Sequence, residues 1–216
     1  MALRDGPRRR IRSITALAAL LATGQAAALE YAPREFPGRS GLRLNVYTPL
    51  EDIEIVRNVE PGDSFTAEVA WVHSYPVQPL SRFRLSGSPA LAVVVQSADD
   101  QGITVDYTAP IVRYHLGLVT ELTEYLRIEA TPFVGIGFGF LDISVPEFEE
   151  YEPGLTVEYG LNLGVFANIG SVEFGGGAGY VNRQGLQRFV FEQSTVVRLD
   201  VDQEYFCAFL TGGWRF

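Results

Sequence analysis

The chain has 216 residues, of which 47% are hydrophobic, and its formal net charge is −9. This length fits one domain, and the negative charge argues against nucleic acid and anionic lipid surfaces as electrostatic partners. The single cysteine excludes an internal disulfide.

The first 28 residues predict a cleaved secretory signal peptide. Four arginines between positions 8 and 12 precede an apolar stretch, 14–22, which is too short to span a bilayer. Residues 26–28 are all alanine and supply the small side chains of a cleavage site. Removal of residues 1–28 takes away five arginines and one aspartate, so the mature chain has 12 basic and 25 acidic residues and a net charge of −13.

Eight segments that alternate apolar and polar residues follow, and each predicts a β-strand. In chain order they are 39–48, 64–73, 82–96, 102–114, 125–140, 154–168, 171–181 and a last strand that includes 206–216. Runs of 10 to 16 residues exceed the roughly 5–6 typical of soluble sheets and meet the roughly 9–11 tilted residues of a membrane crossing. No later stretch is apolar for about 18 residues, which excludes a helical membrane protein. An all-β fold is therefore expected.

The last strand has one apolar face and one smaller, more polar face. The apolar face consists of Phe206, Ala208, Leu210, Gly212, Trp214 and Phe216. Trp214 and Phe216 suit the aromatic belt at a membrane interface. On these residues the chain resembles the bacterial outer-membrane β-barrel family, whose last strand typically ends in phenylalanine and serves as an assembly signal.

The resemblance is to small barrels of the OmpA/OmpX kind. It implies an eight-stranded antiparallel up-and-down transmembrane β-barrel over residues 29–216, located in the bacterial outer membrane. It also implies partners, namely the barrel-assembly machinery, outer-membrane lipid and lipopolysaccharide. With both ends of the barrel in the periplasm, the shorter connectors 74–81, 115–124 and 168–171 lie on that side. The extracellular connectors are then 49–63, 97–101, 141–153 and 182–203, mostly longer, which is typical of outer-membrane barrels.

The inward face of the predicted strands collects charged residues of both signs. They are Arg43, Arg82, Arg84, Arg127 and Arg215 with Glu68, Asp106, Glu129, Glu158 and Glu173. Eight strands leave a lumen just wide enough for side chains, and buried charges are tolerated when they are paired. The sequence therefore predicts an ion-pair network that plugs the lumen, with a narrow small-solute pore as the alternative.

Support for catalysis is weak. His73 and His115 are expected at the periplasmic ends of their strands, whereas lipid A lies in the outer leaflet. His73 and Ser74 are adjacent in a strand and therefore face opposite sides. Residues 179–183 lack the His-x-Ser pair that lipid A deacylases carry at about this position of their chains. We therefore expect that the protein is not an enzyme, although a lipid-modifying enzyme of that kind is the alternative.

No cofactor or metal is expected. The acidic run at 147–152 suits a divalent cation in its ligand type, but it lacks EF-hand spacing and a solvated loop is the simpler interpretation. Cys207 is expected to be a small buried hydrophobic residue. The sequence favours a structural or surface-interaction role through the loops 49–63, 141–153 and 182–203, without identifying the extracellular ligand. A soluble periplasmic barrel or sandwich is a third alternative.

Overall fold

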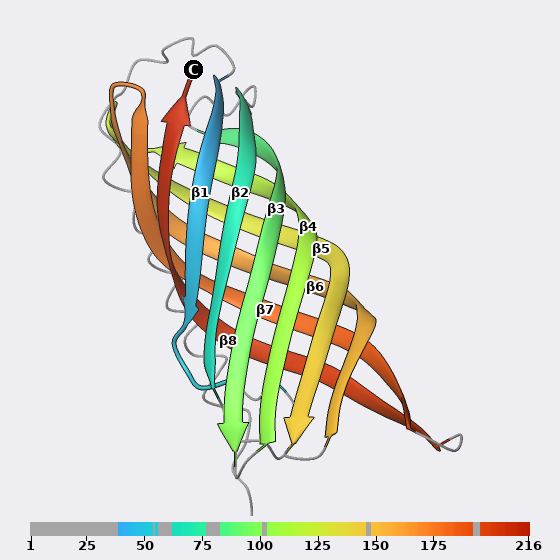
Figure 1. Ribbon diagram of the computed structural model, residues 1–216. Coiled ribbons are helices and arrows are strands. Elements are labelled where there is room, and N and C mark those ends of the chain that lie inside the picture. Colours follow the sequence, from blue (N-terminus) through green and yellow to red (C-terminus); the bar gives the residue numbers. More distant parts are fainter. Residues whose placement is uncertain are drawn as a thin grey trace, which may run out of the picture. The chain divides into compact units, whose positions relative to one another are not determined.

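The described residues form a closed barrel of eight strands (Figure 1). The computed structural model describes residues 39–53, 55, 62–76, 83–100, 103–145, 148–191 and 195–216. The strands are β1 (Arg39–Pro49), β2 (Asp63–Pro76), β3 (Phe83–Asp100), β4 (Ile103–Glu121), β5 (Leu126–Val145), β6 (Phe148–Ile169), β7 (Val172–Phe191) and β8 (Thr195–Arg215). Each strand pairs antiparallel with the next, and β1 pairs with β8. The expected fold class is confirmed, while the expected signal peptide, 1–28, lies outside the described residues.

Two expected loops are mostly strand. β5 continues to Val145 and β6 begins at Phe148, and their pairing extends over the whole hairpin. β7 and β8 likewise pair as far as Phe191 and Thr195. The predicted loops 141–153 and 182–203 are therefore wrong in extent. The backbone ladder holds a hairpin together without an apolar face, so charged residues in its sequence do not end it.

The two ends of the barrel differ in their connections. β1 begins and β8 ends at the same end, which we call the termini end, and the connection 122–125 between β4 and β5 lies there too (Figure 1). The β6–β7 turn at this end is tight, and Gly170 adopts a φ of 61°, which favours glycine. The opposite end, which we call the connector end, carries the β1–β2 connector, residues 50–62.

The outer face of the barrel is apolar. Every strand exposes large hydrophobic side chains there, such as Val112 on β4, Val134 on β5 and Leu210 on β8. Such a face is stable in lipid, and a closed barrel leaves no strand edge unpaired within it. Among the described residues no helix has the length and apolar character to cross a membrane.

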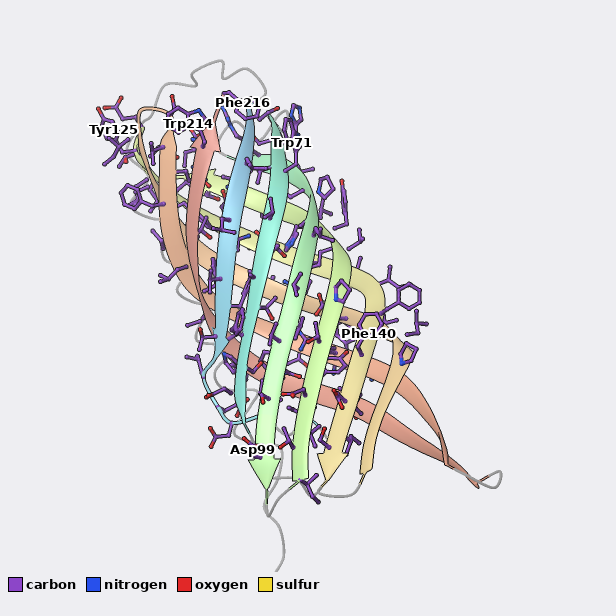
Figure 2. All side chains as sticks on the ribbon, in the orientation of Figure 1. Trp71, Asp99, Tyr125, Phe140, Trp214 and Phe216 are labelled. Atoms are coloured by element: carbon purple, nitrogen blue, oxygen red, sulfur yellow. The ribbon has the colours of Figure 1, made fainter. Side chains whose placement is uncertain are left out.

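Aromatic side chains mark the termini end of this face. Trp71, Tyr125, Trp214 and Phe216 are exposed and lie at that end (Figure 2). The rings of Trp71 and Phe216 meet at a centroid distance of 5.3 Å. The exposure of Trp214 and Phe216 confirms the predicted face of the last strand, and their position suits a membrane–water interface.

Candidate functional site

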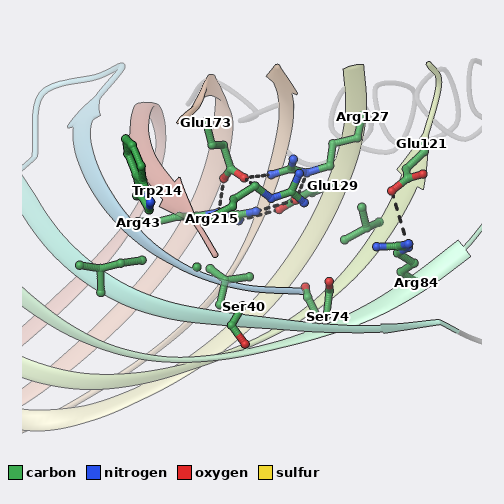
Figure 3. A pocket seen from close by; sticks show the side chains of 15 residues that line it. Ser40, Arg43, Ser74, Arg84, Glu121, Arg127, Glu129, Glu173, Trp214 and Arg215 are labelled. Atoms are coloured by element: carbon green, nitrogen blue, oxygen red, sulfur yellow. Dashed lines mark hydrogen bonds and ion pairs between the residues drawn. The ribbon is translucent and has the colours of Figure 1, made fainter. Parts of the chain in front are cut away.

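The lumen near the termini end contains three arginines and two glutamates in one network, which we call the termini-side cluster (Figure 3). Arg43 donates from both terminal nitrogens to the two carboxylate oxygens of Glu129, each at 2.7 Å. Arg127 Nε donates to Glu129 Oε1 at 2.6 Å. Glu173 pairs with Arg43 and Arg127, and its Oε2 lies 3.3 Å from Arg215 Nε. Two carboxylates thus bridge three guanidinium groups.

An aromatic ring supports this cluster from inside the barrel. Arg43 and Arg127 lie over the ring of Phe166, with their guanidinium carbons 4.7 and 5.2 Å from its centroid. Phe166 is buried, and a cation over an aromatic face is attracted by the ring quadrupole. A separate pair, Arg84 and Glu121, lies in the same pocket with Nε and Oε1 3.6 Å apart (Figure 3).

A second network, which we call the central cluster, consists of Glu68, Arg113, His115, Glu158 and Arg183. Arg113 connects the two carboxylates, because its Nη1 lies 3.0 Å from Glu68 Oε2 and its Nε pairs with Glu158. Arg183 donates to Glu158 Oε2 from Nε and from Nη2, each at 3.2 Å. All five side chains are buried. The charges of this cluster are therefore paired within the barrel wall.

Neutral groups complete the coordination of Glu68. Asn45 Nδ2 donates to its Oε1 at 2.6 Å, and the Tyr47 hydroxyl donates to the same oxygen at 3.2 Å. His115 Nε2 lies 2.9 Å from Oε2, so it donates to the carboxylate. A buried carboxylate with this many donors is satisfied without water.

Eight of the ten predicted lumen residues lie inside the barrel: Arg43, Glu68, Arg84, Arg127, Glu129, Glu158, Glu173 and Arg215. Arg82 lies outside the described residues. Four further charged or titratable lumen residues were not predicted: Arg113, His115, Glu121 and Arg183. Glu121 and Arg183 fell in segments interpreted as connectors.

Asp106 is on the outer face, so its predicted place in the lumen is wrong. It is exposed, while its neighbours Val105 and Tyr107 are buried. The prediction assigned the more apolar residues of β4 to lipid, but the lumen near the connector end is itself apolar. Arg113, eight residues after Val105 and therefore on the same face, carried the signal for the correct orientation.

The two histidines lie in different surroundings. His115 is buried in the lumen, with its ring centroid 5.3 Å from that of Phe133, so its predicted position at the strand end is wrong. β4 continues to Glu121, which places His115 well inside the strand. His73 Nδ1 lies 2.6 Å from Ser40 Oγ. Ser74 is buried and His73 is only partly so, in line with the opposite faces expected of neighbours in a strand.

The β1–β2 connector also enters the lumen. Ile53 is 6% exposed and Ile55 is 2% exposed, and both pack among lumen side chains. The prediction treated 49–63 as an extracellular loop, and among its described residues Leu50, Glu51 and Asp52 are indeed exposed. The two isoleucines correct that prediction for the inner part of the connector.

Little free volume is left between these groups. One cavity of about 20 Å³ lies among the termini-side cluster, and another of about 30 Å³ lies beside Glu68 and His115. A water molecule needs roughly 10–15 Å³ by this measure, so each cavity has room for one or a few waters. Among the described residues, no group of three or more His, Cys, Asp or Glu side chains could hold a metal ion. Cys207 is buried, as expected.

Comparison with known proteins identifies the fold. No protein-family model matches the chain, and no curated protein matches it. A major outer membrane protein of Thermus thermophilus superimposes with a TM-score of 0.54 at 9% identity, covering 84% of this chain and all of that one. Ail of Yersinia pestis gives a TM-score of 0.47 at 14% identity and the same coverage. OprG of Pseudomonas aeruginosa gives 0.41 at 11% identity, covering 83% of this chain and 96% of that one. The Thermus likeness shows that the chain has the architecture of an outer-membrane β-barrel.

Proposed function

We propose that the protein is an integral barrel of the bacterial outer membrane, with a closed lumen and a structural or surface-interaction role. The observation that carries this proposal is the filling of the lumen. The termini-side and central clusters pair their charges across the interior, and the cavities between them have room for only a few waters. A solute could pass only if several charge-assisted hydrogen bonds were broken together.

The energetics of buried ion pairs favour a plug over a pore. Removing one partner of a buried pair costs about 3–5 kcal/mol, because the other charge is left without compensation. Glu173 and Glu129 each bridge at least two guanidiniums, so displacement of either carboxylate leaves more than one cation uncompensated. The network therefore serves to fill the barrel and to hold opposite strands together.

Contact with partners is proposed at the connector end, on the extracellular side. Exposed carboxylates gather there, including Glu51 and Asp52 in the connector and Asp99 at the end of β3 (Figure 2). Electrostatic complementarity favours a partner that carries positive charge. No enzyme activity is proposed.

The aromatic residues at the termini end are proposed to act in assembly. Phe216 packs against Trp71, and its backbone N–H donates to the Ser40 carbonyl at 3.0 Å. Phe216 thereby joins β8 to the start of β1, where the barrel closes. Its recognition by the barrel-assembly machinery, and contact of the belt with lipopolysaccharide, are parts of this proposal.

Conductance measurements test the closed lumen. The wild-type barrel, inserted into planar lipid bilayers, should give no steady current, because no continuous water path crosses the two clusters. A steady current through wild-type protein, together with a stability that is indifferent to loss of Glu158, would identify a hydrated pore instead.

Lipid analysis tests the absence of enzyme activity. Mass spectrometry of lipid A and phospholipids from cells with and without the protein should give the same spectrum. Appearance of deacylated or newly acylated lipid only in expressing cells would overturn this part of the proposal.

A further inference from the structure

The β1–β2 connector is attached to β8 where it leaves β1. Leu50 N donates to the Phe206 carbonyl at 2.8 Å, and Phe206 N donates to Glu51 Oε1 at 3.3 Å. From there the connector turns inward, because Leu50 is 63% exposed whereas Ile53 and Ile55 are buried. It therefore starts at the barrel wall and continues into the lumen.

Ile55 occupies an apolar part of the lumen, which we call the connector-end chamber. Its walls include Ala92, Val94, Ala98, Ala109, Leu141 and Val201. These side chains are 0–3% exposed, and several are alanines, which leave space on the barrel axis. Apolar walls offer no ion pairs to fill that space, so an apolar side chain from elsewhere is required.

Ile53 reaches deeper than the chamber. It packs in a second cluster with Tyr47, Tyr205 and Cys207. The Tyr47 ring lies 5.4 Å from the Arg113 guanidinium, so Ile53 approaches the central cluster. The two isoleucines thus fill the lumen from its connector end down to the charged layer.

The connector returns to the wall at Gly62. Ile53 and Gly62 form an isolated antiparallel bridge. A Cβ at position 62 would lie 1.8 Å from the Ser97 carbonyl oxygen, so this close contact with β3 needs glycine. Neither Ile53 nor Ile55 belongs to the ladder that closes the barrel. The inserted residues can therefore leave without breaking a hydrogen bond between named strands.

We propose that the β1–β2 connector is a retractable stopper. Ile53 and Ile55 close the connector end of the lumen, and their withdrawal opens the connector-end chamber to water as far as the central cluster. The ion-pair clusters belong to the strands and stay in place, so the opened chamber is blind. The stopper goes beyond the proposed function, in which the strand side chains alone form the barrier.

A thiol reporter in the chamber tests the stopper. Cys207, the only native cysteine, is replaced by alanine, and Ala98→Cys supplies a reporter in the chamber wall. The folded barrel is then exposed to a small, charged methanethiosulfonate reagent. With Ile53 and Ile55 in place, labelling should be slow but should reach completion as the connector withdraws transiently. Ile55→Asp should raise the rate about ten- to hundredfold, the factor that corresponds to the burial of one isoleucine side chain.

Matched variants make the result decisive. Leu50→Asp introduces the same chemical change at an exposed position of the connector and should leave the rate unchanged. Ile55→Ala serves if the aspartate variant fails to fold, as judged by its heat-dependent migration on SDS gels. Fast labelling with Ile55 in place would overturn the stopper, and so would no labelling at all or equal rates in the Ile55 and Leu50 variants. A steady current through the Ile55→Asp barrel would instead contradict the closed central cluster, which belongs to the proposed function.

Discussion

Replacing Glu158 by alanine should destabilise the folded barrel strongly. The Glu158 side chain is fully buried and pairs with both Arg113 and Arg183. Arg113 keeps a second carboxylate, because Glu68 Oε2 lies 3.0 Å from its Nη1. For Arg183 the structure gives no other carboxylate among the described residues. Its remaining partners are the neutral Gln203, at 3.0 Å, and the ring of Tyr205, at 5.7 Å.

The expected loss follows from this difference between the two arginines. Orphaning one buried charge costs about 3–5 kcal/mol of unfolding free energy. Water can enter the space of the deleted side chain and solvate Arg183, so we expect a value near the low end, about 3 kcal/mol. The double variant Glu158→Ala/Arg183→Ala should be more stable than the sum of the single variants predicts, because the uncompensated cation is gone. Coupling in such networks is about 0.5–3 kcal/mol.

Denaturant unfolding in lipid or detergent measures this loss. Unfolding is followed by the fluorescence of Trp71 and Trp214 and by gel migration without boiling. Asp202→Ala removes an exposed carboxylate on β8 and serves as the control, with an expected change within about 0.5 kcal/mol. If Glu158→Ala and Asp202→Ala unfold at the same denaturant concentration, the lumen is well hydrated and the reasoning fails.

Three further changes probe other parts of the barrel. Phe216→Asp should lower the amount of assembled protein in the outer membrane, since it places a charge in the aromatic belt where β8 joins β1; a wild-type level at native expression would contradict this. Gly177→Ala should disrupt the β6–β7 ladder, because its Cβ would lie 2.0 Å from the Leu163 carbonyl oxygen. Gly212→Ala, where nothing lies within 4 Å, is its control in the same unfolding assay. Arg127→Ala should lower the unfolding midpoint, because Glu129 and Glu173 lose a shared partner; an unchanged midpoint would mean that these carboxylates are solvated.

The lumen residues could be predicted to the extent that the local pattern reveals orientation. In β1, β2, β3 and β5 to β8, the face that carries arginine, glutamate and small residues is the buried one. This holds because successive side chains of a strand face opposite sides, so a short run is enough to assign both faces. The pattern failed in β4, where both faces are largely apolar near the connector end and Asp106 points outward.

The sequence alone determined the number of strands, their order and most of their orientations. These properties depend on local alternation and on the turn residues between strands. The tertiary structure decided which charges pair, since Arg43 on β1 meets Glu129 on β5, 86 positions away. It also decided that the β5–β6 and β7–β8 hairpins extend through the expected loops, and that Ile53 and Ile55 enter the lumen. Closure of the barrel sets which strands face one another across the lumen, and the space left on its axis decides what must fill it. Neither quantity is recorded in any one segment of the chain.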